Sequence, residues 1–312
     1  MSAETVMTPP SQVAALPEPR RMAHGTRHRV QSRVFRIGRW VVIIGFLIAT
    51  LVPFYYMLLL SVKPIGSLLQ NPASLWVRPS EFTLQTYVDV LSSTASGGQG
   101  FGRFLVNSGV VALASVALAL LIGIPGAYAI ARLPFIGRRY ISGIFLAAYL
   151  FPAILMAIPL FVGFTRLGLR GNLVGLIIVY TAQTVPVAIY MLRNYFETVP
   201  EAIEEAGLVD GLSRLGVLRQ ISLKLALPSI MSTGLFVFMI AWNEFLFALL
   251  FLAENRPRWT VSLGLAQLAG SIEIHTTVLM AGSVLLTLPI VLLFFLAERL
   301  LVEGLTSGAE KG

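Results

Sequence analysis

The most constraining feature of this chain is a series of long apolar segments that contain almost no charged residues. A helix needs about 20 apolar residues to cross the roughly 30 Å hydrocarbon core of a bilayer, and only one of these segments contains an acid, Glu244. Hydrophobic residues make up 56% of the 312 residues and charged residues 12%. We therefore predict an all-α, polytopic membrane protein with six transmembrane helices, at about Trp40–Leu60, Phe104–Ala131, Tyr140–Phe164, Leu173–Leu192, Leu225–Leu252 and Thr276–Ala297.

The basic residues indicate how these helices are oriented. Most of the 23 lysines and arginines lie in four places. These are the N-terminal tail, the segment between the second and third predicted helices, the segment between the fourth and fifth, and the C-terminus. Because short cytoplasmic segments carry an excess of Lys and Arg, both termini and the fourth-to-fifth connection are expected in the cytoplasm. The net charge of +8 is then explained by topology and by affinity for the anionic leaflet, and nucleic-acid binding is not needed.

The sequence also indicates how the chain is divided. Residues 1–36 lack an apolar core for a cleavable signal and are predicted to be a disordered, basic cytoplasmic tail. Residues 37–303 are predicted to form the six-helix transmembrane domain, with an external cap at 63–103 and a cytoplasmic loop at 194–224. Residues 304–312 are predicted to form a glycine-rich cytoplasmic tail. Trp259–Ile272 is too short to span a bilayer and is expected to be an interfacial or re-entrant helix.

The cytoplasmic loop is unusually polar and acidic for its setting. Thr198 and Glu201 have the spacing of a capping box, so a short helix is expected to begin there. Gly211 can adopt the left-handed conformation that ends such a helix, and Ser213 can cap a second one. The first helix would present a flat surface of small residues to another protein, at Ala202, Ala206, Gly207 and Leu208, rimmed by the carboxylates of Glu201, Glu204 and Glu205.

At this loop the chain resembles the permease subunits of ATP-binding-cassette importers. Their hallmark is Glu-Ala-Ala, three residues, Gly, nine residues, Ile, one residue and Leu-Pro, and Glu205-Ala206-Gly207, Gly211, Ile221 and Leu223 reproduce that spacing. Two positions depart from it. Gly207 replaces the second Ala at a cost of about 1 kcal/mol in helix propensity, and Lys224 replaces the Pro, which is expected to make the start of the fifth span less kinked.

Two further segments resemble the shorter permease subunit of the maltose-importer type. They are Ala241-Trp242-Asn243-Glu244-Phe245-Leu246-Phe247-Ala248 in the fifth span and the glycine-rich C-terminus from Gly304 to Gly312. The resemblance covers about Trp40 to Gly312. It implies the permease fold of a type I importer in a bacterial or archaeal cytoplasmic membrane, with no catalytic residues of its own.

The resemblance also implies the partners of the chain. A second permease subunit would complete the pathway, two ATPase subunits would bind ATP and magnesium below it, and an external binding protein would deliver a sugar or oligosaccharide. This chain lacks the glycine-rich phosphate loop that ATP binding would need. The residues expected to couple it to the ATPase are Glu204, Glu205, Ala206, Gly207, Asp210, Gly211 and Ile221, with Gly308 and Lys311 as a C-terminal contact.

Polar residues inside the spans are candidates for the translocation pathway. An acid at the centre of a span costs about 2.5–3.5 kcal/mol on translocon scales, so Glu244 is expected to face protein or water. It could contact the solute or pair within the helix bundle. Asn243 and Gln183 could bind a sugar hydroxyl, although such residues commonly join neighbouring helices. His275 stands alone at the external end of the sixth span, with no second His, no Cys and no spaced carboxylate pair, so a metal role is not expected.

Three other functions remain to be compared with a sugar importer. An importer for another solute, such as glycerol phosphate, would use the same scaffold. An ion-coupled secondary transporter would commonly show inverted repeats and several ionisable residues in its spans, which this sequence lacks. A membrane-embedded enzyme would need catalytic side chains that converge at one depth, and no such pattern is present.

Overall fold

The computed structural model describes residues 25–72, 74–271 and 275–309, and every regular element in these ranges is helical. This confirms the all-α prediction. The elements are α1 Gly25–Ser61, α2 Ile65–Gln70, α3 Gln85–Leu91, η1 Thr94–Ser96, α4 Phe101–Arg132, α5 Arg138–Leu150, α6 Ala153–Arg166, α7 Leu173–Thr198, α8 Glu201–Val209, α9 Arg214–Val217, η2 Leu218–Ser222, α10 Leu223–Leu225, α11 Leu227–Asn243, α12 Leu246–Leu252, η3 Arg256–Arg258, α13 Val261–Ala269 and α14 Thr276–Ala309.

The chain divides into two units, Met1–Phe54 and Tyr55–Gly312. In the first unit α1 begins at Gly25, inside the segment predicted to be a disordered tail. The second unit holds the other helices, and the rest of the description concerns it. In this unit the predicted external cap contains α2, α3 and η1, and α14 continues as a helix to Ala309.

Four helices are long and apolar enough to cross a membrane, at Phe35–Ser61, Phe101–Arg132, Leu173–Thr198 and Thr276–Glu298. Two bent pairs bring the number to six if each pair is one span. The third predicted span is not one straight helix, because α5 and α6 are bent by 83° around Phe151 and Pro152. The fifth is interrupted at Glu244 and Phe245, where α11 ends and α12 begins.

Small residues bring the two central helices, α4 and α7, close together. Ala119 and Ala188 are fully buried, and a Cβ added at Gly123 would lie 3.4 Å from the Cβ of Ala188. Such residues let helix backbones approach closely where apolar lipid gives no hydrophobic driving force for helix association. The closely packed α4–α7 pair therefore lies at the centre of the helix bundle, and α11 packs against both helices.

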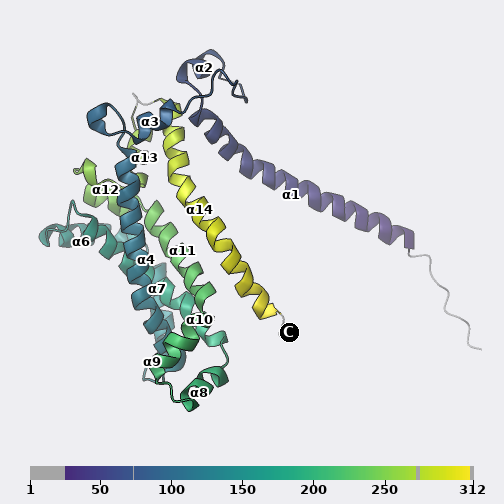
Figure 1. Cartoon of the computed structure of the whole chain (residues 1–312), viewed down its shortest axis with the longest axis vertical. Helices are drawn as coiled ribbons and strands as arrows, with labels where there is room; N and C mark the ends of the chain where they lie inside the picture. The colour runs from purple at the N-terminus through teal and green to yellow at the C-terminus, as the bar shows by residue number, and fades with distance from the viewer. Residues whose placement is uncertain (1–24, 73, 272–274, 310–312) are drawn as a thin grey trace, which may run out of the picture. The chain divides into compact units, whose positions relative to one another are not determined.

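The two ends of this helix bundle differ (Figure 1). One end carries α3, α12 and α13, and α13 has only nine residues, too few to cross a bilayer. There Phe104 packs directly against Gly264, where an added Cβ would lie 2.5 Å from the ring. The other end carries α8, α9 and α10, which form the predicted cytoplasmic loop.

Candidate functional site

The loop after α7 folds as two short helices with a glycine corner, as the sequence predicted. Helix α8 begins at Glu201, and Gly211 adopts φ +89° in the turn that follows α8. This left-handed conformation strains any residue with a side chain. The Ser213 hydroxyl accepts a hydrogen bond from the Gly216 amide at 3.2 Å, so Ser213 caps α9 as expected.

The predicted capping box at the start of α8 is wrong. Helix α7 continues through Thr198, and the Thr198 hydroxyl donates to the carbonyl of Tyr195 instead of accepting from α8. Pro200 occupies the N-cap position and makes no side-chain cap. The rigid ring of a proline before the first turn and the acidic residues in that turn favour the helix without a box.

Of the adjacent acids of α8 one points inward and the other outward, which corrects the predicted docking surface. Glu205 is exposed, whereas Glu204 is only 5% exposed and points into the protein. Gly207 is also buried, so it does not contribute to a flat outer face. The exposed residues of α8 and its turn are instead Glu201, Ala202, Ile203, Glu205, Ala206, Val209 and Asp210.

Glu204 is the centre of a buried polar cluster. One carboxylate oxygen accepts a hydrogen bond from the Ser222 hydroxyl at 2.9 Å, and the other accepts from Tyr128 at 3.2 Å. The Arg132 Nε lies 3.3 Å from the carboxylate as an ion pair without hydrogen-bond geometry. In the sequence Arg132 contributes only to the positive charge between the second and third predicted helices, and Tyr128 and Ser222 are not among the predicted site residues. Tyr128 and Arg132 could have been paired from their four-residue spacing at the end of one predicted helix, whereas no signal in the sequence marks Ser222.

Gly207 makes room for Ile221, so the departure from the hallmark has a steric reason. A Cβ at position 207 would lie 2.5 Å from Ile221 Cδ1, 3.4 Å from a Val217 methyl and 3.5 Å from a Leu212 methyl. Ile221, the isoleucine of the hallmark, thus packs against Gly207, which stands where the hallmark has its second alanine. The structure brings both ends of the motif together.

The expectation that Lys224 would make the start of the fifth span less kinked is wrong. Residues 214–225 and 227–243 are bent by 77° at Ala226. Pro228, in the first turn of α11, has no amide hydrogen to continue the preceding helix. The Tyr195 hydroxyl of α7 donates to the Leu225 carbonyl that the break leaves free. A proline four residues after Lys224 therefore coincides with the bend.

The candidate pathway residues lie near two helix breaks. Glu244 lies where α11 ends, and its carboxylate accepts hydrogen bonds from the amides of Phe247 and Ala248 in α12 and from the Tyr180 hydroxyl of α7. It therefore pairs within the bundle. Asn243 is exposed, and its amide donates to the Met239 carbonyl.

Gln183 faces a cleft of about 700 Å³ between α6, α7 and α11. The cleft includes the break between α5 and α6, and all of its lining side chains are uncharged. Ile240, one turn before Asn243, lies in the wall of the cleft, whereas Asn243 and Glu244 do not. The structure thus separates Gln183 from the other two candidates.

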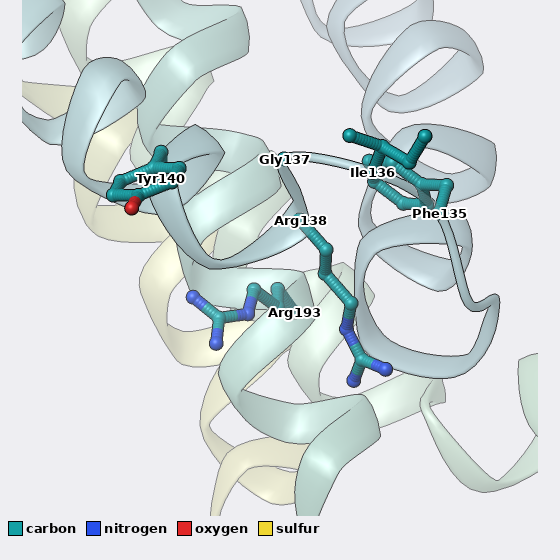
Figure 2. Close-up of a pocket in the computed structure, with 6 residues that line it drawn as sticks. All are labelled: Phe135, Ile136, Gly137, Arg138, Tyr140 and Arg193. Carbon is teal, nitrogen blue, oxygen red and sulfur yellow. The ribbon is translucent and has the colours of Figure 1, made fainter.

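A second hollow lies between the α4–α5 turn and α7, and Figure 2 shows its lining. Arg138 and Arg193 turn their guanidinium groups in different directions. Arg138 donates to the Ala131 carbonyl, and Arg193 pairs with Glu197 at 2.8 Å. Because the two cations do not converge, this hollow lacks the geometry of an anion site.

The two predicted C-terminal contacts lie at the very end of the chain. Gly308 lies within α14, which ends at Ala309, whereas Lys311 lies outside the described residues.

Residues 119–306 match the family described as binding-protein-dependent transport system inner membrane component. The chain is 38% identical to the inner membrane ABC transporter permease protein YcjP of Escherichia coli, over 89% of this chain and 97% of that one. It is 35% identical to the trehalose/maltose transport system permease protein MalG of Thermococcus litoralis, over 88% and 98%.

A similar fold occurs in a solved bacterial ABC transporter involved in the import of the acidic polysaccharide alginate. The TM-score is 0.72 at 23% identity, over 86% of this chain and 97% of that chain.

Proposed function

Because the chain belongs to the family of binding-protein-dependent transport system inner membrane components, it is a multi-pass permease of the inner membrane, and we propose that it imports a sugar or oligosaccharide. The permease works with an ATPase, a binding protein and further permease subunits. In the proposed complex, one copy of this chain and one copy of a second permease form the transport pathway. An ATPase dimer binds below them. The observation that supports the solute class most directly is the set of carbohydrate permeases to which the chain is similar, such as the trehalose/maltose protein at 35% identity.

The outward face of α8 and its turn is the surface that we assign to the ATPase. Glu205, Ala206 and Asp210 are exposed there, and Gly211 sets the corner that follows. Small side chains allow close approach, and carboxylates at the rim give the surface a charge that a basic cleft can recognise. In this proposal Gly207 and Ile221 support the surface from behind, and Gly308 and Lys311 form a C-terminal contact with the same partner.

A neutral solute is favoured by the cleft around Gln183. The cleft is lined mostly by apolar and aromatic side chains, including Tyr149, Phe151 and Phe164, with the Gln183 amide as a polar group. This combination suits a sugar, which offers apolar ring faces and hydroxyl groups. Glycerol phosphate would require cations to bind its phosphate, and the cleft lining includes none. An ion-coupled transporter is not proposed, because members of this family receive the solute from a binding protein and use the ATP hydrolysis of a partner ATPase.

The orientation proposed from the basic residues places α8, the N-terminus and the C-terminus in the cytoplasm. Arg132 contacts Glu204 of α8, Arg193 pairs with Glu197 near the end of α7, and Arg214 begins α9. A cluster of arginines around α8 agrees with the positive-inside rule. Residues 63–103 then face outward, where the binding protein delivers the solute. Cysteines introduced singly into either end would test this, because the chain contains none.

The test of the proposal begins with a tagged chain purified in mild detergent. Mass spectrometry should find a second permease and an ATPase subunit in stoichiometric amounts, and proteoliposomes of this complex should take up a labelled sugar only with ATP and the binding protein. Glycerol phosphate as the transported solute would contradict the sugar assignment. A chain that purifies alone and transports without ATP would contradict the whole proposal.

Two variants test the surface assigned to the ATPase. Glu205→Lys reverses an exposed charge of α8, and Gly211→Pro removes the amide that donates to the Leu208 carbonyl and cannot adopt φ +89°. Both should abolish ATP-driven uptake while the second permease still co-purifies. Glu197→Lys is the matched control, because it reverses a surface charge at the end of α7 that is next to α8. Uptake at the wild-type rate in Glu205→Lys and Gly211→Pro would refute the assignment.

A further inference from the structure

The buried cluster around Glu204 joins α8 to the membrane helices at a point that the sequence motif does not describe. Arg132 is the last residue of α4, and its side chain is 6% exposed. Its guanidinium donates to the carbonyls of Phe196 and Val199, at the end of α7. The same group lies 3.3 Å from the carboxylate of Glu204 and 3.5 Å from that of Glu201. One arginine therefore holds the ends of α4 and α7 and the start of α8.

The carboxylate of Glu204 is satisfied from its other side as well. Tyr128, one turn before Arg132 on α4, donates to it, and so does Ser222 at the end of η2. Both oxygens of this nearly buried carboxylate thus have neutral donors in addition to the arginine. A buried charge is tolerated when it is paired and hydrogen-bonded in this way. The four side chains Tyr128, Arg132, Glu204 and Ser222 are called the clamp below.

The other connections from α8 to the membrane helices run along the backbone, through turns and breaks. Toward α11 the chain passes through the corner at Gly211, the π-helical segment η2 and the 77° break at Ala226. Toward α7 only Val199 and Pro200 intervene. Movement of α8 could be absorbed at these joints. The clamp bypasses them, because it connects α8 to the paired core of α4 and α7.

From this geometry we propose that the clamp is the positioning element that converts displacement of α8 by the ATPase into movement of α4 and α7. The inference rests on the proposed function, since it assumes that α8 receives the ATPase. Glu204 acts through Arg132 and contacts neither solute nor nucleotide. Its neighbour Glu205 faces the ATPase. In this proposal Glu205 contacts the ATPase, and Glu204 transmits the displacement of α8 to Arg132.

The test uses the whole complex in proteoliposomes, with uptake and ATP hydrolysis measured on the same sample. Glu204→Gln keeps the size of the side chain and an acceptor oxygen but removes the charge that pairs with Arg132. We expect ATP hydrolysis within about twofold of wild type and uptake reduced at least about tenfold, a change of about 1.4 kcal/mol in coupling. Glu197→Gln, which removes a surface ion pair of α7, should leave the ratio of uptake to hydrolysis unchanged.

The ratio separates transmission from simple stability. If Glu204 only stabilised the fold, Glu204→Gln would lower uptake and hydrolysis in proportion and leave the ratio at the wild-type value, and that result would overturn the proposal. Tyr128→Phe is the second variant, because it removes a single hydroxyl and keeps the ring that packs edge-on against Phe196. It should lower the ratio two- to fivefold even if Glu204→Gln does not assemble.

The proposed function and the clamp fail in different ways. A wild-type complex that hydrolyses ATP without taking up sugar would refute the proposed function and the clamp together. A wild-type complex that couples normally, with an unchanged ratio in both Glu204→Gln and Tyr128→Phe, would refute the clamp alone.

Discussion

Replacing Gly207 with alanine should have an effect opposite to the one that helix propensity predicts. Alanine in place of glycine within a helix is favourable by about 1 kcal/mol, so an isolated α8 would become more stable. In the protein, however, the new Cβ would lie 2.5 Å from Ile221 Cδ1, with Val217 and Leu212 also close. Overpacking of this kind typically costs about 1–3 kcal/mol. The closest atom is the end of the Ile221 side chain, which can turn aside in part, so Gly207→Ala should destabilise α8 by at most about 2 kcal/mol after the propensity gain is subtracted.

The cause can be isolated with a second substitution. Ile221→Val removes the Cδ1 atom and should cost about 0.5–1.5 kcal/mol by itself, as such truncations do. In the double variant the alanine methyl occupies the space that Cδ1 has left. The two changes should then compensate each other, with a coupling free energy of about 1–2 kcal/mol, within the range seen for residues in direct contact.

Hydrogen exchange measured by mass spectrometry on the purified complex gives the required local readout, because it reports the opening of α8 separately from global unfolding. Peptides that cover residues 200–212 should exchange faster in Gly207→Ala, by about tenfold for a loss of 1.4 kcal/mol, and return toward the wild-type rate in the double variant. Slower exchange in Gly207→Ala, or additive effects of the two substitutions, would show that the steric argument is wrong.

Three further predictions concern the membrane helices. Tyr180→Phe removes one hydrogen bond to the Glu244 carboxylate and should lower the free energy of unfolding by about 1–3 kcal/mol, seen as a lower Tm of the detergent-solubilised complex; an unchanged Tm would contradict it. Gly264→Ala places a Cβ 2.5 Å from the ring of Phe104, which is only 3% exposed, and should cost about 1–3 kcal/mol; Phe104→Leu in the same chain should restore much of the loss. Gln183→Leu removes the amide from the cleft and should raise the KM for sugar uptake several-fold without changing ATP hydrolysis in the absence of solute; a KM equal to that of wild type would exclude Gln183 from the pathway.

The sequence predicted the helices well and their interruptions poorly. Apolar length is sufficient to identify a span, because the bilayer fixes how many residues are needed. Proline content does not say where a span bends. Pro125 and Pro186 lie inside the continuous helices α4 and α7, whereas a break occurs next to Pro152. The difference depends on which neighbouring groups satisfy the freed backbone, and that is a property of the packed structure.

The same limit applies to the candidate site. Spacing alone located α8, Gly211 and Ser213, because local conformational preferences determine caps and corners. It could not distinguish Glu204 from Glu205, since adjacent helical residues have the same chemistry but point about 100° apart. Which of them is buried depends on Arg132 at the end of α4, far away along the chain.

The hydrogen bonds at the interruption of the fifth span have a consequence for energetics. Glu244 is the only acid in the six apolar segments, and its carboxylate already serves as the acceptor for the first amides of α12 and for Tyr180. A carboxylate held in this way satisfies backbone amides that the helix break leaves without partners. It is therefore not available to carry a proton through the bilayer. Uptake should consequently persist when the membrane potential and the proton gradient are dissipated, provided that ATP is present, because in the proposed mechanism the ATPase moves this subunit through α8.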